Sequence, residues 1–159
     1  MIDTSFDMFI ETEVPENELI ISRTDLKGVI TYVNDTFADI SGYEPDELVG
    51  KAHNIVRHPD MPKSAFADVW KTIGEGKVWS GYIKNMRKDR GYYWVHAEVS
   101  GVYKDGTLVE YKSLRSPVEI ENKLEMQTLY DKLRKEEEGS ERVVTYLSTE
   151  QIEQLKSII

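Results

Sequence analysis

The sequence contains no cysteine among its 159 residues. Disulfide frameworks, thiolate metal sites and cysteine nucleophiles are therefore excluded, and a cytoplasmic location is favoured. Basic charge is also scarce, because 20 Lys and Arg stand against 29 Asp and Glu and leave a formal net charge of −9. Proteins bind phosphate backbones through clustered Lys and Arg, so this balance argues against a nucleic-acid-binding protein. It disfavours contact with anionic membrane surfaces for the same reason.

Long hydrophobic runs are absent as well. The longest apolar stretches, such as residues 29–33, have the length of a strand and are interrupted by polar residues. A membrane-spanning helix needs about 20 predominantly apolar residues. The N-terminus is acidic, whereas a secretory signal begins with basic residues followed by an apolar run. We therefore expect a soluble chain that reaches a membrane only through a partner.

The length accommodates one domain of ordinary size, about 100–150 residues, with an appendage. We predict an acidic N-terminal cap over residues 1–18, a central sensor domain over residues 19–117 and a helical extension over residues 118–159. Pro15 prevents the cap from forming one continuous helix. The chemistry is therefore expected in the central domain.

The extension carries the pattern of two amphipathic helices. Apolar residues recur at three- and four-residue spacing up to about Glu138, and Gly139 then ends the first helix. Ser148 and Gln151 form a capping box that starts a second helix. Such helices are typical of signalling or dimerisation segments. The apolar side of the first comprises Ile120, Leu124, Met126, Leu129, Tyr130 and Leu133.

The central domain shows two sheet-forming regions with helices between them. Residues 19–24 and 29–33 flank a turn that contains Gly28, which predicts a hairpin. Asn34 is a candidate N-cap for the helices that follow. We predict an α+β fold, with five antiparallel strands and helices on one face that leave room for a ligand. The last three strands lie at residues 78–87, 92–103 and 107–116, and the longest helix has an apolar stripe of Phe66, Val69, Trp70 and Ile73.

Residues 53–62 are the least generic stretch, with two histidines, an arginine and a carboxylate before a helix. Asp60 is a candidate N-cap for that helix. The unpaired backbone N–H groups at the start of the helix, together with the guanidinium of Arg57, suit a pyrophosphate. An equally weighted alternative is that Arg57 pairs with Asp60 on the surface while the histidines cap or pack.

Metal binding and catalysis receive little support from the sequence. His53 and His58 are five residues apart and lack a clear third nitrogen or sulfur ligand. The sequence has no nucleophile elbow around its serines and no phosphate-binding loop with a following lysine. We therefore expect neither a metal site nor an enzyme.

Aromatic residues are frequent in the longest helix and in the last three strands, where the ordinary interpretation is an aromatic core. Asn85 is harder to explain, because it is expected to share a strand face with Trp79 and Ile83. A buried amide needs a hydrogen-bonding partner, and a planar heteroaromatic ligand supplies one.

Several motifs together resemble the PAS domains of aerotaxis and energy-taxis receptors of the Aer type. The run Arg57-His58-Pro59-Asp60-Met61-Pro62 is the most specific, and the resemblance covers about residues 19–117. It implies a PAS fold that holds FAD non-covalently, as a flavoprotein whose redox state reports respiratory electron flow. The other motifs are Asn34-Asp35-Thr36-Phe37, Ser41-Gly42-Tyr43, His53-Asn54, Ala65-Phe66-Ala67-Asp68 with Trp70, Trp79-Ser80-Gly81, Lys84-Asn85, Tyr93-Trp94-Val95 and the segment from Gly106 to Arg115.

The resemblance also implies roles for individual residues. Arg57, His58 and Asp60 would belong to the FAD-binding loop, and Asn34 would support the pocket. Trp70 and Trp79 would line the cofactor or stack on it. The residues around the isoalloxazine would be His53, Asn85, Tyr93 and Tyr111. Because the chain has no cysteine, light sensing through a flavin–cysteine bond is excluded.

Without a membrane anchor, the chain resembles the separate, soluble PAS partner of a bipartite energy-taxis system. Its partner in chemotaxis would then be a membrane-bound transducer on another chain, and it could also pair with a second copy of itself. Two alternatives stay open. A gas sensor would hold heme through His53 or His58, and a cofactor-free PAS adaptor would use its extension to pair proteins. A flavin-dependent enzyme is disfavoured, since no nicotinamide-binding motif is present.

Overall fold

The computed structural model describes residues 10–138. The predictions for the first nine residues and for the helix that starts at Ser148 lie outside this range. Among the described residues, no helix is both long and apolar enough to cross a membrane.

The core of the fold is one antiparallel sheet of five strands in the order β2-β1-β5-β4-β3. β1 pairs with both β2 and β5, so it joins the first hairpin to the later meander. This arrangement confirms the predicted five-stranded sheet. The strands are β1 (Ile20–Thr24), β2 (Ile30–Val33), β3 (Trp79–Met86), β4 (Tyr92–Lys104) and β5 (Thr107–Ser116).

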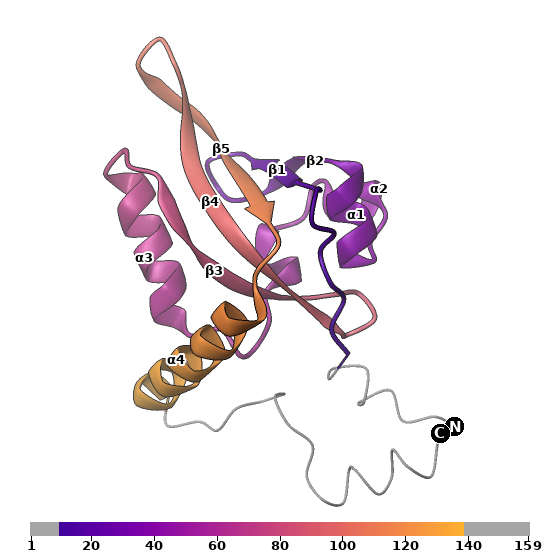
Figure 1. Ribbon diagram of the computed structural model, residues 1–159. Coiled ribbons are helices and arrows are strands. Elements are labelled where there is room, and N and C mark those ends of the chain that lie inside the picture. Colours follow the sequence, from indigo (N-terminus) through magenta and orange to yellow (C-terminus); the bar gives the residue numbers. More distant parts are fainter. Residues whose placement is uncertain (1–9, 139–159) are drawn as a thin grey trace, which may run out of the picture.

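Helices between β2 and β3 cover one face of the sheet, as predicted (Figure 1). A final helix, α4 (Ile120–Glu138), lies on the other face. Its Tyr130 ring stacks on Trp94 of β4, which alternates with the inward-facing Tyr93. The helices of the first face are α1 (Asp35–Ser41), α2 (Pro45–Leu48), the 3₁₀ helix η2 (His53–Val56) and α3 (Lys63–Gly74).

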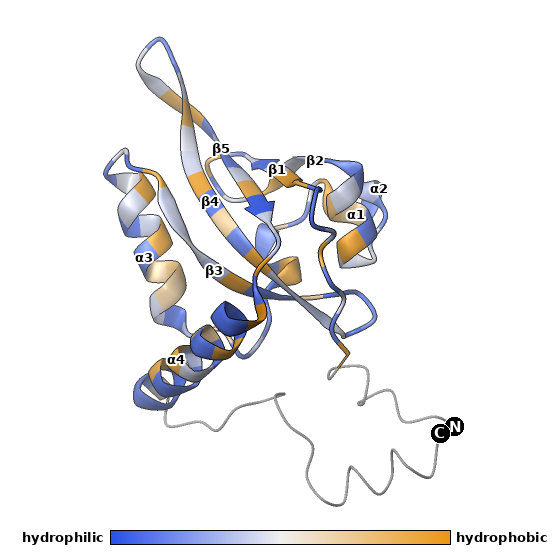
Figure 2. Ribbon diagram, viewed as in Figure 1, coloured by the Kyte–Doolittle hydropathy of each residue, from blue (hydrophilic) through white to orange (hydrophobic). Residues whose placement is uncertain are grey.

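The hydrophobic core lies between the sheet and α1 to α3. Figure 2 shows apolar residues concentrated in the middle of the strands and on α1, while α4 and the tip of the β4–β5 hairpin are largely hydrophilic. Burial of apolar surface is the main force that holds the two layers together. Completely buried members include Ile20, Phe37, Leu48 and Val95.

Asn34 joins α1 to the first strand. Its Oδ1 accepts hydrogen bonds from the backbone N–H of Phe37, at 3.1 Å, and of Ile21, at 3.0 Å. Its Nδ2 donates to the carbonyl of Leu19 at 2.8 Å. The predicted N-cap is thus confirmed, and the same side chain also fixes the start of β1.

Trp79 joins β3 to α3. Its indole Nε1 donates to Asp68 of α3 at 2.9 Å, and its ring lies over Gly81 of the same strand. A Cβ at Gly81 would come within 2.7 Å of the Trp79 ring, so the absence of a side chain there makes room for the indole.

The start of α3 differs from the prediction. The N-cap is Pro62, which makes no side-chain cap hydrogen bond, and Asp60 does not cap the helix. Asp60 is drawn inward because buried cations surround it, with Lys84 Nζ 2.9 Å from its Oδ2. The proposed stripe is also only partly buried, since Val69 faces the core whereas Trp70 is 51% exposed.

The buried side of α4 is more polar than its sequence pattern predicts. Ile120 and Leu124 of the predicted apolar side are more than half exposed, whereas Lys123 and Arg134 are buried. The physical reason lies in the surface that α4 meets, which presents carboxylates such as Asp60. A helix that docks on buried acids needs cations on its docking side.

Candidate functional site

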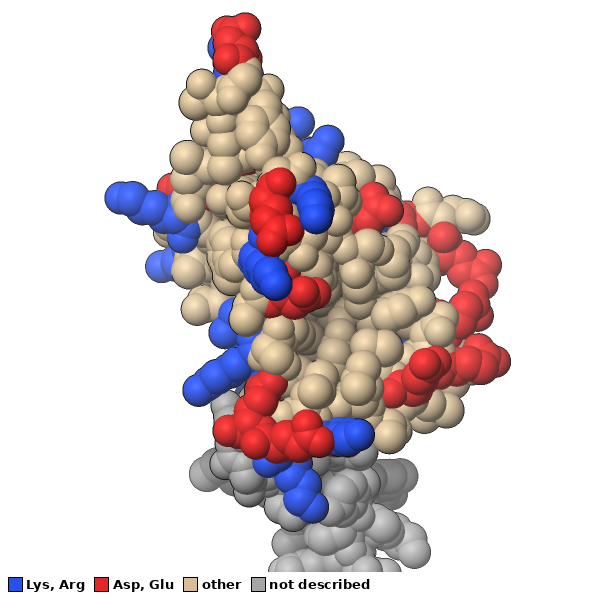
Figure 3. All heavy atoms as spheres, turned by 90° about the vertical axis from the view of Figure 1, so that its left-hand side faces the viewer, with Lys and Arg blue, Asp and Glu red and all other residues tan. Residues whose placement is uncertain are grey.

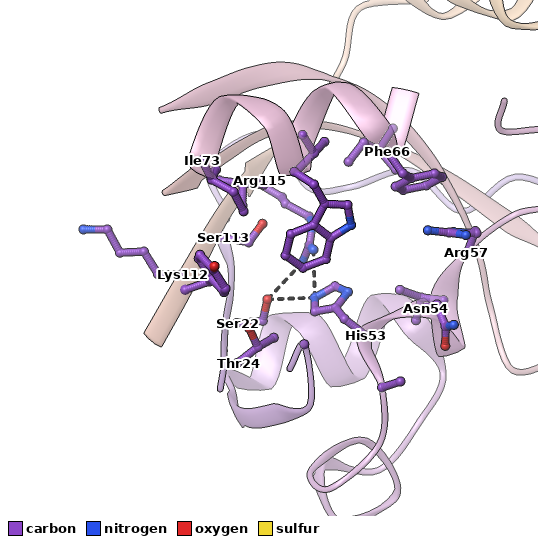
Figure 4. A pocket seen from close by; sticks show the side chains of 18 of the residues that line it. Ser22, Thr24, His53, Asn54, Arg57, Phe66, Ile73, Lys112, Ser113 and Arg115 are labelled. Atoms are coloured by element: carbon purple, nitrogen blue, oxygen red, sulfur yellow. Dashed lines mark hydrogen bonds between the residues drawn. The ribbon is translucent and has the colours of Figure 1, made fainter. Parts of the chain in front are cut away.

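A cavity of about 330 Å³ lies between α3, η2 and the inner face of the sheet, within the usual range for small-molecule sites (Figure 4). Residues from β1, β3 and β5 form one wall, and residues from η2 and α3 form the other. Five of the predicted site residues line it: His53, Arg57, Trp70, Asn85 and Tyr111.

His53 is held by a hydrogen-bonded group at the wall of the cavity (Figure 4). Its Nε2 lies 2.9 Å from the guanidinium of Arg115 and 3.0 Å from the hydroxyl of Ser22. Because a guanidinium only donates, Nε2 must accept, and the ring proton of the neutral imidazole is on Nδ1. Burial, together with the charge of Arg115, lowers the pKa of His53 to about 3. The imidazole is therefore neutral at physiological pH.

Arg115 brings a buried positive charge to the same wall. It is 5% exposed, and among the described residues no carboxylate forms an ion pair with it. Burial lowers its pKa to about 10, which leaves the guanidinium charged at neutral pH. A buried cation without a counter-ion is costly unless a ligand completes its surroundings.

Three side-chain atoms at the wall lack hydrogen-bond partners within the described range. They are Nδ2 of Asn85, Oγ of Ser113 and Nε of Arg115, and all three belong to residues that line the cavity. The amide of Asn85 also lies near the hydroxyl of Tyr93, but its Nδ2 makes no hydrogen bond of ordinary geometry there. Buried polar groups are normally paired, so these atoms indicate a ligand with hydrogen-bonding groups on its edge.

The mouth of the cavity is aromatic. Trp70 lines it while remaining half exposed, and its indole meets the Tyr111 ring edge-on with centroids 5.8 Å apart. The guanidinium carbon of Arg57 lies 3.7 Å from the centroid of the Phe66 ring. A half-exposed indole and an arginine that line the same cavity suit a ligand that has both a flat ring and an anionic group.

The N-terminus of α3 is already occupied, contrary to the pyrophosphate interpretation. The backbone N–H groups of Lys63 and Ser64 donate to the carboxylate of Glu137 from α4, at 3.0 and 3.2 Å. The helix N-terminus is therefore not available for a phosphate, and Arg57 is the remaining group that was proposed to bind one. The alternative pairing of Arg57 with Asp60 is wrong, because Arg57 lies over Phe66 and Asp60 faces Lys84.

The other predicted site residues do not line the cavity. His58 and Asp60 are buried on the far side of the loop that contains Arg57, and Nδ1 of His58 accepts from the backbone N–H of Asp60 at 2.9 Å. Tyr93 is 1% exposed and pairs with Asn85 across the β3–β4 ladder. Asn34 and Trp79 hold α1 and α3 to the sheet as described above.

A family model described as the PAS fold matches residues 30–115. The chain belongs to the PAS family. Among curated proteins, it is 43% identical over 122 residues to the aerotaxis receptor of Escherichia coli K12, a match that covers 77% of this chain and 24% of that receptor. The chain thus spans a quarter or less of the length of the first curated relatives that it matches.

Solved structures show the same fold. The PAS domain of a protein from Colwellia psychrerythraea superposes with a TM-score of 0.59 at 21% identity, covering 63% of this chain and 86% of that one. A light-oxygen-voltage domain studied with a flavin analogue superposes with a TM-score of 0.60 at 21% identity, covering 72% and 87%. At such identities, these structures support the PAS architecture alone.

Among the polar residues that line this PAS cavity, three that share the sheet wall were not predicted as site residues. Ser22 comes from β1, and Ser113 and Arg115 come from β5, where Ser22 and Ser113 are direct partners in the sheet. Each lies in an ordinary strand pattern. Only the pairing of the first strand with the last one places them at a shared wall.

Metal and nucleic-acid binding gain no support from this PAS domain. Over residues 10–138, no group of three or more His, Cys, Asp or Glu side chains is placed to hold a metal ion. On the face seen in Figure 3, most basic side chains lie toward the left-hand edge and most acidic ones toward the right, and uncharged residues separate the basic ones, so they form no continuous basic surface. The cavity is thus the best candidate for function.

Proposed function

We propose that this PAS domain is a sensor of energy taxis that binds FAD non-covalently and passes the redox state of the flavin to a chemotaxis transducer. The observation that carries the proposal is the row of unpaired polar atoms on Asn85, Ser113 and Arg115, set in a cavity with an aromatic mouth. The 43% identity to an aerotaxis receptor supports the choice of signal. A cytoplasmic location and a separate membrane-bound transducer belong to the same proposal.

The residues present fit a flavin. The donors of Asn85 and Arg115 and the hydroxyl of Ser113 match the carbonyl and nitrogen edge of an isoalloxazine. Trp70 and Tyr111 offer ring surface at the mouth, and Arg57 offers a positive charge for the diphosphate. When bound, FAD supplies reversible electron transfer that is accompanied by a change in ring protonation.

Asn85 is the residue best suited to respond to that change. Its amide both donates and accepts, so a rotation of the side chain adapts to a ring atom that gains or loses a proton. Its backbone forms an isolated bridge with Arg57, and its strand partner is Tyr93. A new orientation of the Asn85 amide would therefore alter contacts with the loop that contains Arg57 and with β4.

This mechanism predicts that Asn85→Leu leaves FAD bound but removes the structural response to reduction. Hydrogen exchange of oxidised and reduced protein measures that response, with His96→Leu, on the other face of the sheet, as the control. An Asn85→Leu protein whose exchange still changes on reduction would contradict the mechanism.

Heme is a poor fit to the same cavity. Nε2 of His53 accepts from Arg115, and neutral His53 carries its proton on Nδ1, so no ring nitrogen is left to ligate iron. His58 does not line the cavity.

The absorption spectrum of the purified protein tests the proposal. We expect two broad flavin bands, either as purified or after incubation with FAD, and release of FAD on heat denaturation. One intense Soret band would replace the proposal with heme, and a protein that stays colourless in excess FAD would favour a cofactor-free adaptor.

A further inference from the structure

A cluster of buried charges lies behind the cavity, between the loop of residues 57–62 and α4. Asp60 is 1% exposed, and its Oδ2 accepts from Nζ of Lys84 at 2.9 Å. Arg134 of α4 is 2% exposed, and its Nη1 donates to the carbonyl of Asp60 at 2.9 Å and lies 3.6 Å from Asp60 Oδ1. A buried carboxylate is thus held from both a strand and α4.

α4 makes two more polar contacts with the same region. Gln127 accepts from Nζ of Lys84 at 2.9 Å, so the lysine joins the helix and Asp60. Glu137 accepts from the backbone N–H groups of Lys63 and Ser64. The chain from Asp60 to the first turn of α3 is therefore tied to α4 through both backbone and side chains.

This attachment point is three residues from Arg57, which lines the cavity. The intervening backbone is short and fixed, because Arg57 bridges to Asn85 of β3 and His58 accepts from the N–H of Asp60. Asp60 is therefore joined to Arg57 by a short, hydrogen-bonded stretch of backbone, through which its position can act on the position of Arg57.

We propose that Arg134 is a positioning residue for the cofactor, which holds Asp60 and thereby keeps Arg57 placed for the diphosphate of FAD. The proposal rests on the proposed function. If Arg134 has this role, the docking of α4 on the domain and the binding of FAD are coupled. Each of these two equilibria then changes the other by the same factor. A bound FAD then strengthens the docking of α4, and release of α4 weakens FAD binding.

The affinities of the full chain for FAD and for riboflavin, which lacks the diphosphate, test this role. Arg134→Met should lower FAD affinity about tenfold, within the range typical of coupled sites, and leave riboflavin affinity within about twofold. Arg134→Lys should restore part of the loss, and Lys135→Met, at an exposed neighbour on α4, should change neither affinity. An equal loss for both flavins, or no loss, would overturn the proposal.

A second variant and a second readout cover the case in which Arg134→Met does not fold. Glu137→Gln removes an exposed charge and should weaken FAD, but not riboflavin, in the same way. If the wild-type chain binds neither flavin, the proposed function fails. Hydrogen exchange of the ligand-free protein then tests whether α4 holds the loop of residues 57–62 in place. Faster exchange at residues 57–62 in either variant supports it, and faster exchange confined to α4 refutes it.

Discussion

Arg115 is the single residue that most sharply distinguishes a ligand cavity from an ordinary core. It is buried, charged and turned toward His53 and Ser22, while its Nε lacks a partner in the described range. Burial of this guanidinium is costly, because its partners His53 and Ser22 are neutral and no carboxylate of the described residues forms an ion pair with it. Its presence favours a ligand that completes the hydrogen bonding.

Replacing this cation should therefore cost affinity. Hydrogen bonds to charged groups contribute about 1.5–3 kcal/mol, so we expect Arg115→Met to weaken FAD binding by about tenfold to a hundredfold. Isothermal titration calorimetry measures the change. Arg23→Met on β1, where Arg23 is exposed and pairs with Glu110, is the control and should bind FAD normally. Equal affinities for the two variants would show that Arg115 does not contact the ligand.

The buried histidines predict how stability depends on pH. Burial and the charges of Lys84 and Arg134 lower the pKa of His58 to about 3, and that of His53 is also about 3, against an unfolded value of about 6.5. Between these values the unfolded chain binds more protons, so stability is complete above about pH 6.5 and falls as the pH drops toward 3.

Urea denaturation of the ligand-free chain at pH 7, 6 and 5 measures this slope. His58→Asn keeps an acceptor for the backbone N–H of Asp60 but removes one titrating group, so its stability should fall less steeply. A variant with the slope of the wild type would contradict the assignment of His58.

Sequence reasoning succeeded for residues with local roles and missed those that depend on strand pairing. The capping role of Asn34 follows from its immediate neighbours. Ser22 and Arg115 meet across 93 positions of sequence, and their contact depends on the β1–β5 register. Trp79 was predicted at the ligand, but its indole turns to Asp68 because Gly81 leaves room for it.

At the scale of elements, the β3–α3 contact depends on this glycine. Gly81→Ala would force the Trp79 indole from its place, so we expect a loss of about 1–3 kcal/mol in the free energy of unfolding, typical of overpacking. Gly74→Ala is the matched control, because no atom lies within 4 Å of its added methyl group. Urea denaturation followed by tryptophan fluorescence compares them, and equal stabilities would rule out the packing explanation.

The elements themselves were largely predictable. Turn residues and two-residue periodicity located the strands, because these signals are local. The polar docking side of α4 was missed, since periodicity places apolar residues inward unless the partner surface is charged. That surface contains Asp60 and Glu11, and Glu11 lies 2.7 Å from Nζ of Lys123.

At the scale of the whole molecule, a continuous series of contacts connects one wall of the cavity, one loop and one helix. The wall contains the unpaired groups of Asn85 and Arg115, the loop contains Arg57, and Asp60 ties that loop to Arg134 of α4. A sensor needs such a connection, because a ligand shifts a conformational equilibrium only through contacts that differ between two states.

Anaerobic reductive titration of the FAD-loaded full chain tests the central claim most directly. We predict that dithionite removes the absorbance of oxidised flavin, that air restores it, and that FAD remains bound to the protein on filtration in both states. A chain that takes up no FAD, or one that releases FAD on reduction, would contradict the account.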